Sequence, residues 1–309
     1  MDTNIIPKIS VVMTVYNGSK WIKSSIQSVL NQSFTNFELI IVDDHSQDDS
    51  LDIIREFSDH RIRLIPLQRN MGLPSALNLA ITQAMGTYIA RLDQDDLMRG
   101  NRLDLQSIYL DKNIDCALVG SWADIITESG QTIGSHRHPT CNGVIQLQLL
   151  FDNPFVHSSV LMRRSSIMDV GLYCTDTARQ PPEDYELWSR LSRKYNLKNL
   201  PQMLTYYREV QGSLSREKSI IIRENVIKIS TDNLHHLIHK KYSKLDCLNL
   251  AQIMHRKSVA TNINYLKRSR MVFYAGILIY KKNKGRPLHL LSALIAIWLR
   301  MTIFSLINK

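Results

Sequence analysis

The first hundred residues alternate between short apolar runs and segments with helical periodicity, and this order constrains the fold more than any other feature of the chain. The apolar runs predict buried strands, because a strand covered on both faces is continuously apolar. They are residues 9–14, 37–42, 62–65 and 88–92, with helices predicted over 21–30 and 75–84. Strands joined by helices form right-handed crossovers in a parallel sheet. We therefore expect an α/β fold with a Rossmann-like, mostly parallel sheet flanked by helices.

Polar clusters follow three of the predicted strands, at residues 14–18, 43–46 and 93–96. In an open parallel sheet, ligands bind beyond the carboxyl ends of the strands, where such loops converge. Turn and helix-cap chemistry would be sufficient to explain each loop taken alone. Three polar clusters at equivalent strand ends instead predict one shared site.

The third cluster, Asp93-Gln94-Asp95-Asp96, crowds three carboxylates at the end of a buried run. These carboxylates repel one another and lose solvation, so we expect a cation to compensate their charge. Hard oxygen ligands suit Mg²⁺ or Mn²⁺, and these cations in turn suit a diphosphate. The alternative is that Asp95 and Asp96 only cap the following helix.

Composition places the chain among ordinary globular proteins of a reducing compartment. Its 309 residues, of which 44% are hydrophobic, are enough for one large core and an appendage. Its four cysteines form no C-x-x-C pair, which argues against a zinc site and a disulfide framework. The first eight residues contain no apolar segment, so we expect no secretory signal.

The pattern is irregular over residues 105–211, where we predict strands over 117–122 and 156–162, and a second acidic feature lies within this segment. Pro181 and Pro182 precede a stretch with helical periodicity whose first turn contains Glu183 and Asp184. Carboxylates in the first turn of a helix are favoured by the helix dipole, so capping alone would explain them.

Eight short motifs, in this order along the chain, give it a resemblance to a known family. They are ISVVMTVYNG (9–18), ELIIVDDHS (38–46), NMGL (70–73), YIARLDQDD (88–96), FVHSS (155–159), EDYELW (183–188), YR (207–208) and GSLS (212–215). Together they resemble family 2 glycosyltransferases, which are inverting enzymes with the glycosyltransferase A fold, of the bacterial O-antigen, capsule and exopolysaccharide type. The resemblance covers roughly the first 215 residues.

The resemblance implies how a nucleotide-sugar donor binds, and it favours a UDP-linked sugar. Thr14 and Tyr16 would line the nucleobase pocket, and Asp44 would accept a hydrogen bond from a ring N–H. Asp93 would face the ribose, and Asp95 would bind the Mn²⁺ or Mg²⁺ that bridges the diphosphate. Asp96 would support this site or cap a helix.

The resemblance also implies how the acceptor is activated. Asp184 would be the general base that removes the proton of the acceptor hydroxyl, with Glu183 as the competing candidate. His157, Arg208 and Ser213 are candidates for contacts with the acceptor or the diphosphate. The chain departs from the family pattern at His45, where a glycine is usual, so we expect a different turn there. It also has Gly100 near the position of a usual proline.

The C-terminal third has a different character, and we predict two regions: a catalytic domain over 1–215 and a helical, basic region over 216–309. The second contains 18 Lys and Arg against 4 Asp and Glu. Residues 287–307 are nearly all apolar, yet Arg300 favours a helix in the membrane plane, or one packed on the catalytic domain, over a span. Basic residues before it, from Lys281 to Arg286, would attract anionic lipid.

These expectations combine into one function. The chain would transfer a sugar from a nucleotide donor to a saccharide acceptor, lipid-linked, for cell-surface polysaccharide synthesis, at the inner face of the cytoplasmic membrane. Nucleic acid is not expected as a partner, because no nucleic-acid module accompanies the basic charge. Two alternatives stay open, a sugar nucleotidyltransferase and a catalytically idle membrane adaptor of a polysaccharide-assembly complex.

Overall fold

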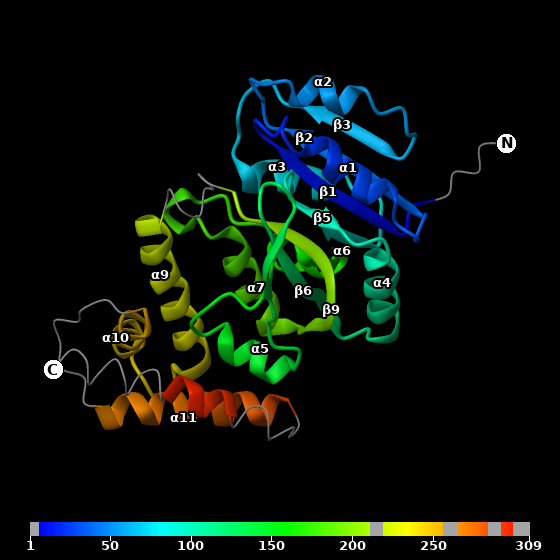
Figure 1. The fold of residues 1–309 in the computed structure, drawn as a ribbon. Coiled ribbons are helices and arrows are strands. Elements are labelled where there is room, and N and C mark those ends of the chain that lie inside the picture. Colours follow the sequence, from blue (N-terminus) through cyan, green and yellow to red (C-terminus); the bar gives the residue numbers. More distant parts are fainter. Residues whose placement is uncertain (1–5, 211–218, 256–264, 284–291, 299–309) are drawn as a thin grey trace. The chain divides into compact units, whose positions relative to one another are not determined.

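A computed structural model describes residues 6–210, 219–255, 265–283 and 292–298 of the protein (Figure 1). The chain divides into two compact units, each built from segments distant in sequence. The sheet unit comprises Met1–His138, Phe155–Thr175 and Lys194–Ser213, and the helical unit comprises Pro139–Pro154, Asp176–Arg193 and Leu214–Lys309. The helical unit therefore takes two segments from within the first 215 residues.

The described part of the sheet unit contains a nine-stranded sheet in the order β3-β2-β1-β4-β8-β6-β9-β5, with β7 paired to β6. The strands are β1 (Ile9–Val15), β2 (Phe37–Asp43), β3 (Ile62–Pro66), β4 (Tyr88–Arg91), β5 (Leu97–Met98), β6 (Cys116–Ile126), β7 (Thr132–His136), β8 (Leu161–Arg163) and β9 (Asn196–Arg208). The first four strands pair in parallel, as do β6 and β9, while β5, β7 and β8 pair antiparallel. The predicted mostly parallel sheet is confirmed.

Helices cover this sheet because their apolar faces pack against it. The helices of the sheet unit are α1 (Ile22–Leu30), α2 (Ser50–Arg55), α3 (Leu73–Gln83), α4 (Arg102–Lys112) and α6 (Arg164–Asp169). α3 packs on β1 and β2, and α4 packs on β6. α1 buries Ile22, Ile26 and Val29 at the expected helical spacing. The core beneath them contains the apolar residues of β1, β2 and β4.

The strand predicted over residues 156–162 is wrong in its first half. His157–Ser159 form a 3-10 turn, and β8 begins only at Leu161. The hydroxyl and the backbone N–H of Ser159 both donate to the carbonyl of Val156, at 2.8 and 2.9 Å. This local hydrogen bonding competes with the hydrogen bonds of a sheet, which is why the apolar pattern predicted a strand that begins too early.

The helical unit consists of α5 (Asn142–Gln148), α7 (Glu183–Lys194, its last residue in the sheet unit), α9 (Ser219–Ile238), α10 (Lys244–Met254) and α11 (Tyr265–Lys282). Residues 292–298 are also helical. α5, α9, α10 and α11 enclose a second apolar core, which includes Leu147, Leu234, Leu250 and Met271. α10 begins with a capping box between Ser243 and Asp246.

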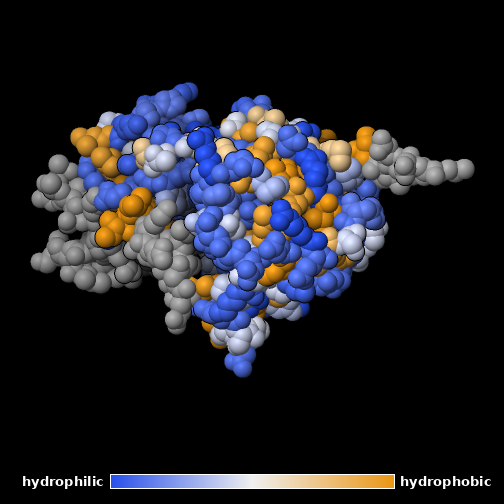
Figure 2. All heavy atoms as spheres, turned by 90° about the horizontal axis from the view of Figure 1, so that it is seen from above, coloured by the Kyte–Doolittle hydropathy of each residue, from blue (hydrophilic) through white to orange (hydrophobic). Residues whose placement is uncertain are grey.

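The hydropathy of the surface and the length of the helices can be compared with the predicted membrane segment. Figure 2 shows a face on which hydrophilic residues predominate, with smaller apolar patches between them. Among the described residues, no helix is long and apolar enough to cross a membrane. Most of the predicted segment 287–307, including Arg300, lies outside the described residues.

Gly86 offers a test of the packing between β1 and the start of β4. Its N–H donates to Ser10 Oγ at 2.8 Å, and an added Cβ would lie 2.5 Å from the Ser10 backbone nitrogen. We expect Gly86→Ala to lower the free energy of unfolding by about 1–3 kcal/mol, measured by urea denaturation, because the backbone of β1 must move. Gly134→Ala is the control, because its nearest contact would be an ordinary 3.5 Å. Equal stability of the two variants would contradict this account.

Candidate active site

The loops after β1, β2 and β4 meet at one edge of the sheet, because these strands are parallel neighbours in the order β2-β1-β4. The N–H of Tyr16 donates to Gln94 Oε1 at 2.9 Å, which joins the first loop to the third. The N–H of Asn17 donates to Ser46 Oγ at 3.1 Å, which joins the first loop to the second. The predicted convergence of the three polar clusters is therefore confirmed.

Asp93, the first carboxylate of the acidic cluster, is fully engaged by the protein. One oxygen pairs with the guanidinium of Arg91, and the other accepts the hydroxyl of Ser158. The Arg91 side chain is completely buried, while that of Asp93 remains 31% exposed. Burial alone would raise the pKa of Asp93, but the charges of Arg91 and His157 and these hydrogen bonds outweigh it and lower the pKa. The resemblance placed Asp93 at the ribose, and its carboxylate already has these two partners.

Asp95 and Asp96 have different surroundings. Asp96 is buried, and its Oδ1 accepts the backbone N–H of Arg208 at 2.7 Å, whereas its Oδ2 has no hydrogen-bond partner in the described structure. Asp95 is partly exposed. Burial and the charge of Asp93 raise the pKa of Asp95 to about 6. Burial, followed by the charges of Asp95 and Asp93, raises the pKa of Asp96 well above its ordinary value.

These carboxylates fit a divalent cation of the Mg²⁺ or Mn²⁺ type. A partly exposed carboxylate with a raised pKa lies beside a buried oxygen without a partner, and a bound cation would relieve both. Within the described ranges, no group of three or more His, Cys, Asp and Glu residues could hold a metal by itself. Mg²⁺ is usually bound by one or two carboxylates together with phosphates and water.

Two buried arginines lie beneath the acidic cluster, and the sequence analysis did not identify either. The first is Arg91, which pairs with Asp93. The second is Arg102, whose guanidinium donates to the backbone carbonyls of Arg91 at 2.9 Å, Val160 at 3.0 Å and Ser158. Burial lowers the pKa of Arg102 to about 9, and the charge of Asp96 opposes that shift. For Arg91, the available sequence signal was a basic residue inside the apolar run 88–92.

The predicted nucleobase residues lie at the first two strand ends. Thr14 is buried, while Tyr16 is 48% exposed and its ring is therefore accessible for stacking. The oxygens of Asp44 accept the backbone N–H groups of Met71 at 2.6 Å and Gly72 at 2.9 Å, so this carboxylate holds the entry to α3. His45 adopts a φ of 66°, the left-handed conformation that glycine favours, so its presence does not by itself require a different turn.

The remaining candidates of the sheet unit have mainly structural partners. His157 Nε2 lies 2.8 Å from the hydroxyl of Tyr173. The guanidinium of Arg208 donates to the carbonyls of Thr127 and Glu128 at 3.0 Å each and of Asp95 at 2.8 Å. Arg208 thus ties the turn between β6 and β7 to the acidic loop. Ser213 lies outside the described residues.

Glu183 and Asp184 occupy the first turn of α7 in the helical unit. Asp184 Oδ2 accepts a hydrogen bond from Asn153 Nδ2 at 2.6 Å, a partner that the sequence analysis did not identify. The next residue, Tyr185, is buried and donates its hydroxyl to the carbonyl of Leu149 at 3.0 Å. These bonds fix the start of α7 to the segment around α5.

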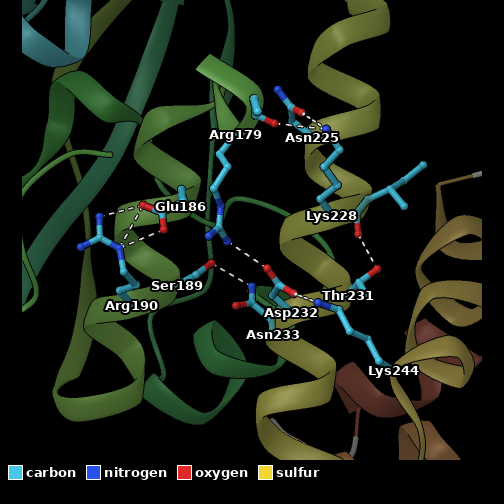
Figure 3. Close-up of polar contacts among 12 residues, drawn as sticks. Arg179, Glu186, Ser189, Arg190, Asn225, Lys228, Thr231, Asp232, Asn233 and Lys244 are labelled. Atoms are coloured by element: carbon cyan, nitrogen blue, oxygen red, sulfur yellow. Dashed lines mark hydrogen bonds and ion pairs between the residues drawn. The ribbon is translucent and has the colours of Figure 1, made fainter. Parts of the chain in front are cut away.

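Polar contacts also fix α7 and the segment before it to α9, as Figure 3 shows. Asp232 on α9 pairs with Arg179 at 2.9 Å and with Lys244 at 3.2 Å. Asn233 donates to Ser189 Oγ on α7 at 2.8 Å. The helix that carries Asp184 is therefore held on two sides within the helical unit.

A mostly parallel sheet with an acidic loop at the edge where the loops of β1, β2 and β4 meet suits a glycosyltransferase. The profile of Glycosyl transferase family 2 matches residues 10–171, and the chain belongs to this family. This membership favours glycosyl transfer over the two alternatives, nucleotidyl transfer and an idle adaptor.

Two of the similar proteins are glycosyltransferases of Escherichia coli. The chain is 32% identical to the O-antigen biosynthesis glycosyltransferase WbnJ of Escherichia coli, over 67% of this chain and 82% of WbnJ. It is 30% identical to WfgD of Escherichia coli, over 68% of this chain and 80% of WfgD. WfgD is named as a UDP-Glc:α-D-GlcNAc-diphosphoundecaprenol β-1,3-glucosyltransferase.

Solved structures share the fold at low identity. TarS of S. aureus, crystallised with UDP-GlcNAc, has a TM-score of 0.63 and 17% identity, covering 88% of this chain and 81% of TarS. The mannosyltransferase PcManGT of Pyrobaculum calidifontis, in complex with GDP-Man and Mn²⁺, has a TM-score of 0.58 and 14% identity, covering 98% of this chain and 88% of PcManGT.

The raised pKa of Asp95 predicts a pH dependence of Mn²⁺ binding. Below the pKa of about 6, a proton competes with the cation for the carboxylate, so affinity falls as the pH is lowered through this value. We expect a loss of about tenfold per pH unit below the pKa, measured as free Mn²⁺ by electron paramagnetic resonance. Asp95→Asn is expected to bind weakly without this dependence. A wild-type affinity that stays constant through pH 6 would contradict the prediction.

Proposed function

We propose that this enzyme transfers a sugar from a UDP-linked donor to a saccharide hydroxyl with inversion of the anomeric configuration. The observation that carries the proposal is the acidic loop after β4, where Asp95 is partly exposed, with a raised pKa, beside the loops of β1 and β2. Carboxylates in this position suit a cation-bridged diphosphate.

On the donor side, we propose that Tyr16 stacks on the nucleobase above Thr14 and that Asp44 accepts a ring N–H. The exposed ring of Tyr16 supports this role, and Asp44 would use oxygen lone pairs that the bonds to Met71 and Gly72 leave available. A divalent cation held by Asp95 would neutralise charge on the departing nucleoside diphosphate. Asp93, oriented by Arg91 and Ser158, would face the ribose.

On the acceptor side, we propose Asp184 as the general base. A single displacement requires a carboxylate that removes the proton of the attacking hydroxyl. The support is its place in the first turn of α7 together with the hydrogen bond from Asn153, which fixes one oxygen and leaves the carboxylate oriented. Glu183 is the competing candidate, in the same turn.

The acceptor is proposed to be a lipid-linked saccharide of a cell-surface polysaccharide. WfgD, whose printed name includes an acceptor on diphosphoundecaprenol, and WbnJ, named for O-antigen biosynthesis, support this class. The enzyme would therefore work at the inner face of the cytoplasmic membrane.

Two substitutions test the assignment of base and metal ligand. Asp184→Asn is expected to lower transfer about 10²–10⁴-fold while UDP binding is retained. Asp95→Asn is expected to abolish both transfer and metal-dependent donor hydrolysis. The assay measures UDP release from a panel of UDP-sugars with Mn²⁺, using α-GlcNAc-diphosphate on a short alkyl chain as acceptor, and NMR of the product gives the anomeric configuration.

Asp52→Asn is the control, because this side chain on α2 is 81% exposed, and its activity should equal that of the wild type. Transfer at the wild-type rate by Asp184→Asn would remove Asp184 as the base. A retained configuration would refute the single displacement.

We further propose that the helical unit attaches to anionic membrane through the outer face of α11. Phe273, Ile277 and Tyr280 are exposed at helical spacing on this helix, and Arg270 and Lys281 flank them. An exposed apolar stripe beside basic residues is typical of helices that lie in the membrane interface.

Lys282, which the sequence analysis placed among the lipid-attracting residues, has protein partners. Its ammonium group donates to the carbonyls of Ser192 at 3.1 Å and Arg193 at 3.2 Å near the end of α7. Lys284 and Arg286 lie outside the described residues. The electrostatic part of the proposal therefore rests on Arg270 and Lys281.

A double substitution tests this surface. Phe273→Ser with Ile277→Ser is expected to reduce the partition coefficient onto phosphatidylglycerol vesicles, measured by flotation, by about 100-fold or more, because each apolar side chain contributes about 1.5–3 kcal/mol when buried. Ile114→Ser is the control, since Ile114 is 80% exposed in the sheet unit. Undiminished flotation of the double variant would show that α11 does not mediate attachment.

A further inference from the structure

A cluster of imidazole and aromatic side chains on β6, β7 and β9 takes no part in the donor site described above. We propose that His136, His138 and Tyr207 form one wall of a subsite that binds the acceptor saccharide through its hydroxyl groups. The inference rests on the proposed function, because that function supplies the position of the donor. All residues that carry it belong to the sheet unit.

The sheet register brings His136 and Tyr207 together. β7 pairs with one edge of β6, where Ala123 is opposite His136, and β9 pairs with the other edge, where Ile125 is opposite Tyr207. Ala123 and Ile125 are two residues apart and so share a face of β6. The His136 and Tyr207 rings meet edge to face with centroids 5.3 Å apart.

The second imidazole extends this wall. The rings of His136 and His138 are nearly parallel, with centroids 5.8 Å apart and an angle of 5° between their planes. The indole N–H of Trp122 donates to the carbonyl of His138 at 2.9 Å, and the guanidinium of Arg137 lies 5.5 Å from the Trp122 ring centroid. The segment after β7 is thus fastened to β6.

Arg208 fixes the wall relative to the acidic loop. It follows Tyr207 directly, and it bonds to Asp96 and to the carbonyl of Asp95 on one side and to the β6–β7 turn on the other.

Burial, together with the negative charges of Asp96, Asp93 and Asp95, raises the pKa of Tyr207 to about 12. Its phenol is therefore protonated near pH 7 and able to donate a hydrogen bond.

The strand order indicates which substrate this wall would contact. β4, which leads into the acidic loop, lies between the nucleotide-binding loops of β1 and β2 and the strands β6, β7 and β9. A donor whose base is held at β1 and β2 and whose diphosphate reaches the acidic loop leaves the β6 side for the attacking sugar. The wall is therefore assigned to the acceptor.

The protonation of the imidazoles favours sugar hydroxyls over phosphate. Burial lowers the pKa of His136, against the charge of Glu209, and burial and His136 together lower the pKa of His138 to about 4. Neutral imidazole offers one donor and one acceptor, which matches a hydroxyl that both donates and accepts. A phosphate-binding wall would instead present cationic donors. The ring faces provide apolar area for the C–H groups of a sugar.

NMR of the histidine rings in the full-length protein tests this subsite. With UDP and Mg²⁺ present, methyl glycosides of glucose, galactose, N-acetylglucosamine and rhamnose are added singly as probes. At least one is expected to shift the ring ¹⁵N–¹H signals of His136 and His138. The signal of His60, whose side chain is 93% exposed, should not move. If no glycoside in the panel shifts either signal, the proposal is refuted.

Substitutions that retain an aromatic ring test the subsite without disturbing the packing of the fold. His136→Phe retains ring packing against Tyr207 but loses hydrogen bonding, so the dissociation constant of the responsive glycoside should rise about tenfold. Tyr207→Phe should act in the same direction, while His60→Phe should have no effect. Binding of UDP should be the same in all four proteins. Wild-type glycoside affinity of His136→Phe would overturn the subsite, whereas failure of every protein to bind UDP would refute the proposed donor site instead.

Discussion

Compensation of charge around the acidic loop is the constraint on which the rest of the site depends. Three carboxylates at the end of a buried strand would repel one another if all were ionised and unpaired. Arg91 pairs with Asp93 directly, while Arg102, bound to three backbone carbonyls, holds the surrounding turns and places its charge near Asp96. The two arginines are buried at a considerable desolvation cost, which their hydrogen bonds offset. The negative charge that these arginines leave uncompensated lies at Asp95 and Asp96, where a divalent cation fits.

Two residues connect the acidic loop to its neighbours through hydrogen bonds. Arg208 uses its backbone N–H for Asp96 and its guanidinium for three carbonyls, so one residue joins β9, the β6–β7 turn and the loop after β4. Gln94 joins that loop to Tyr16. The rim residues proposed to bind the donor and the proposed His136–Tyr207 wall are therefore parts of one hydrogen-bonded framework in the sheet unit.

Much of this was predictable from local pattern. The apolar runs located the first four strands within a residue or two, because a doubly covered parallel strand has a continuous apolar signal. The convergence of the loops at 14–18, 43–46 and 93–96 followed from parallel topology. Ser158 and Asn153 were missed because each acts through a partner distant in sequence: Ser158 is 65 residues from Asp93, and Asn153 is 31 residues from Asp184. Arg91 was missed although Asp93 is only two residues away, because an apolar run does not show that an arginine within it is buried and paired.

The sequence by itself determined the α/β class, the family and the position of the acidic loop at a strand end, since these depend on periodicity and on motifs that are contiguous in the chain. The tertiary structure decided how the carboxylates differ from one another, because burial and the charges of distant residues set their protonation. It also decided that Lys282 contacts α7 and that His136 meets Tyr207 across β6. Such contacts follow from strand register and helix packing, which no local pattern encodes.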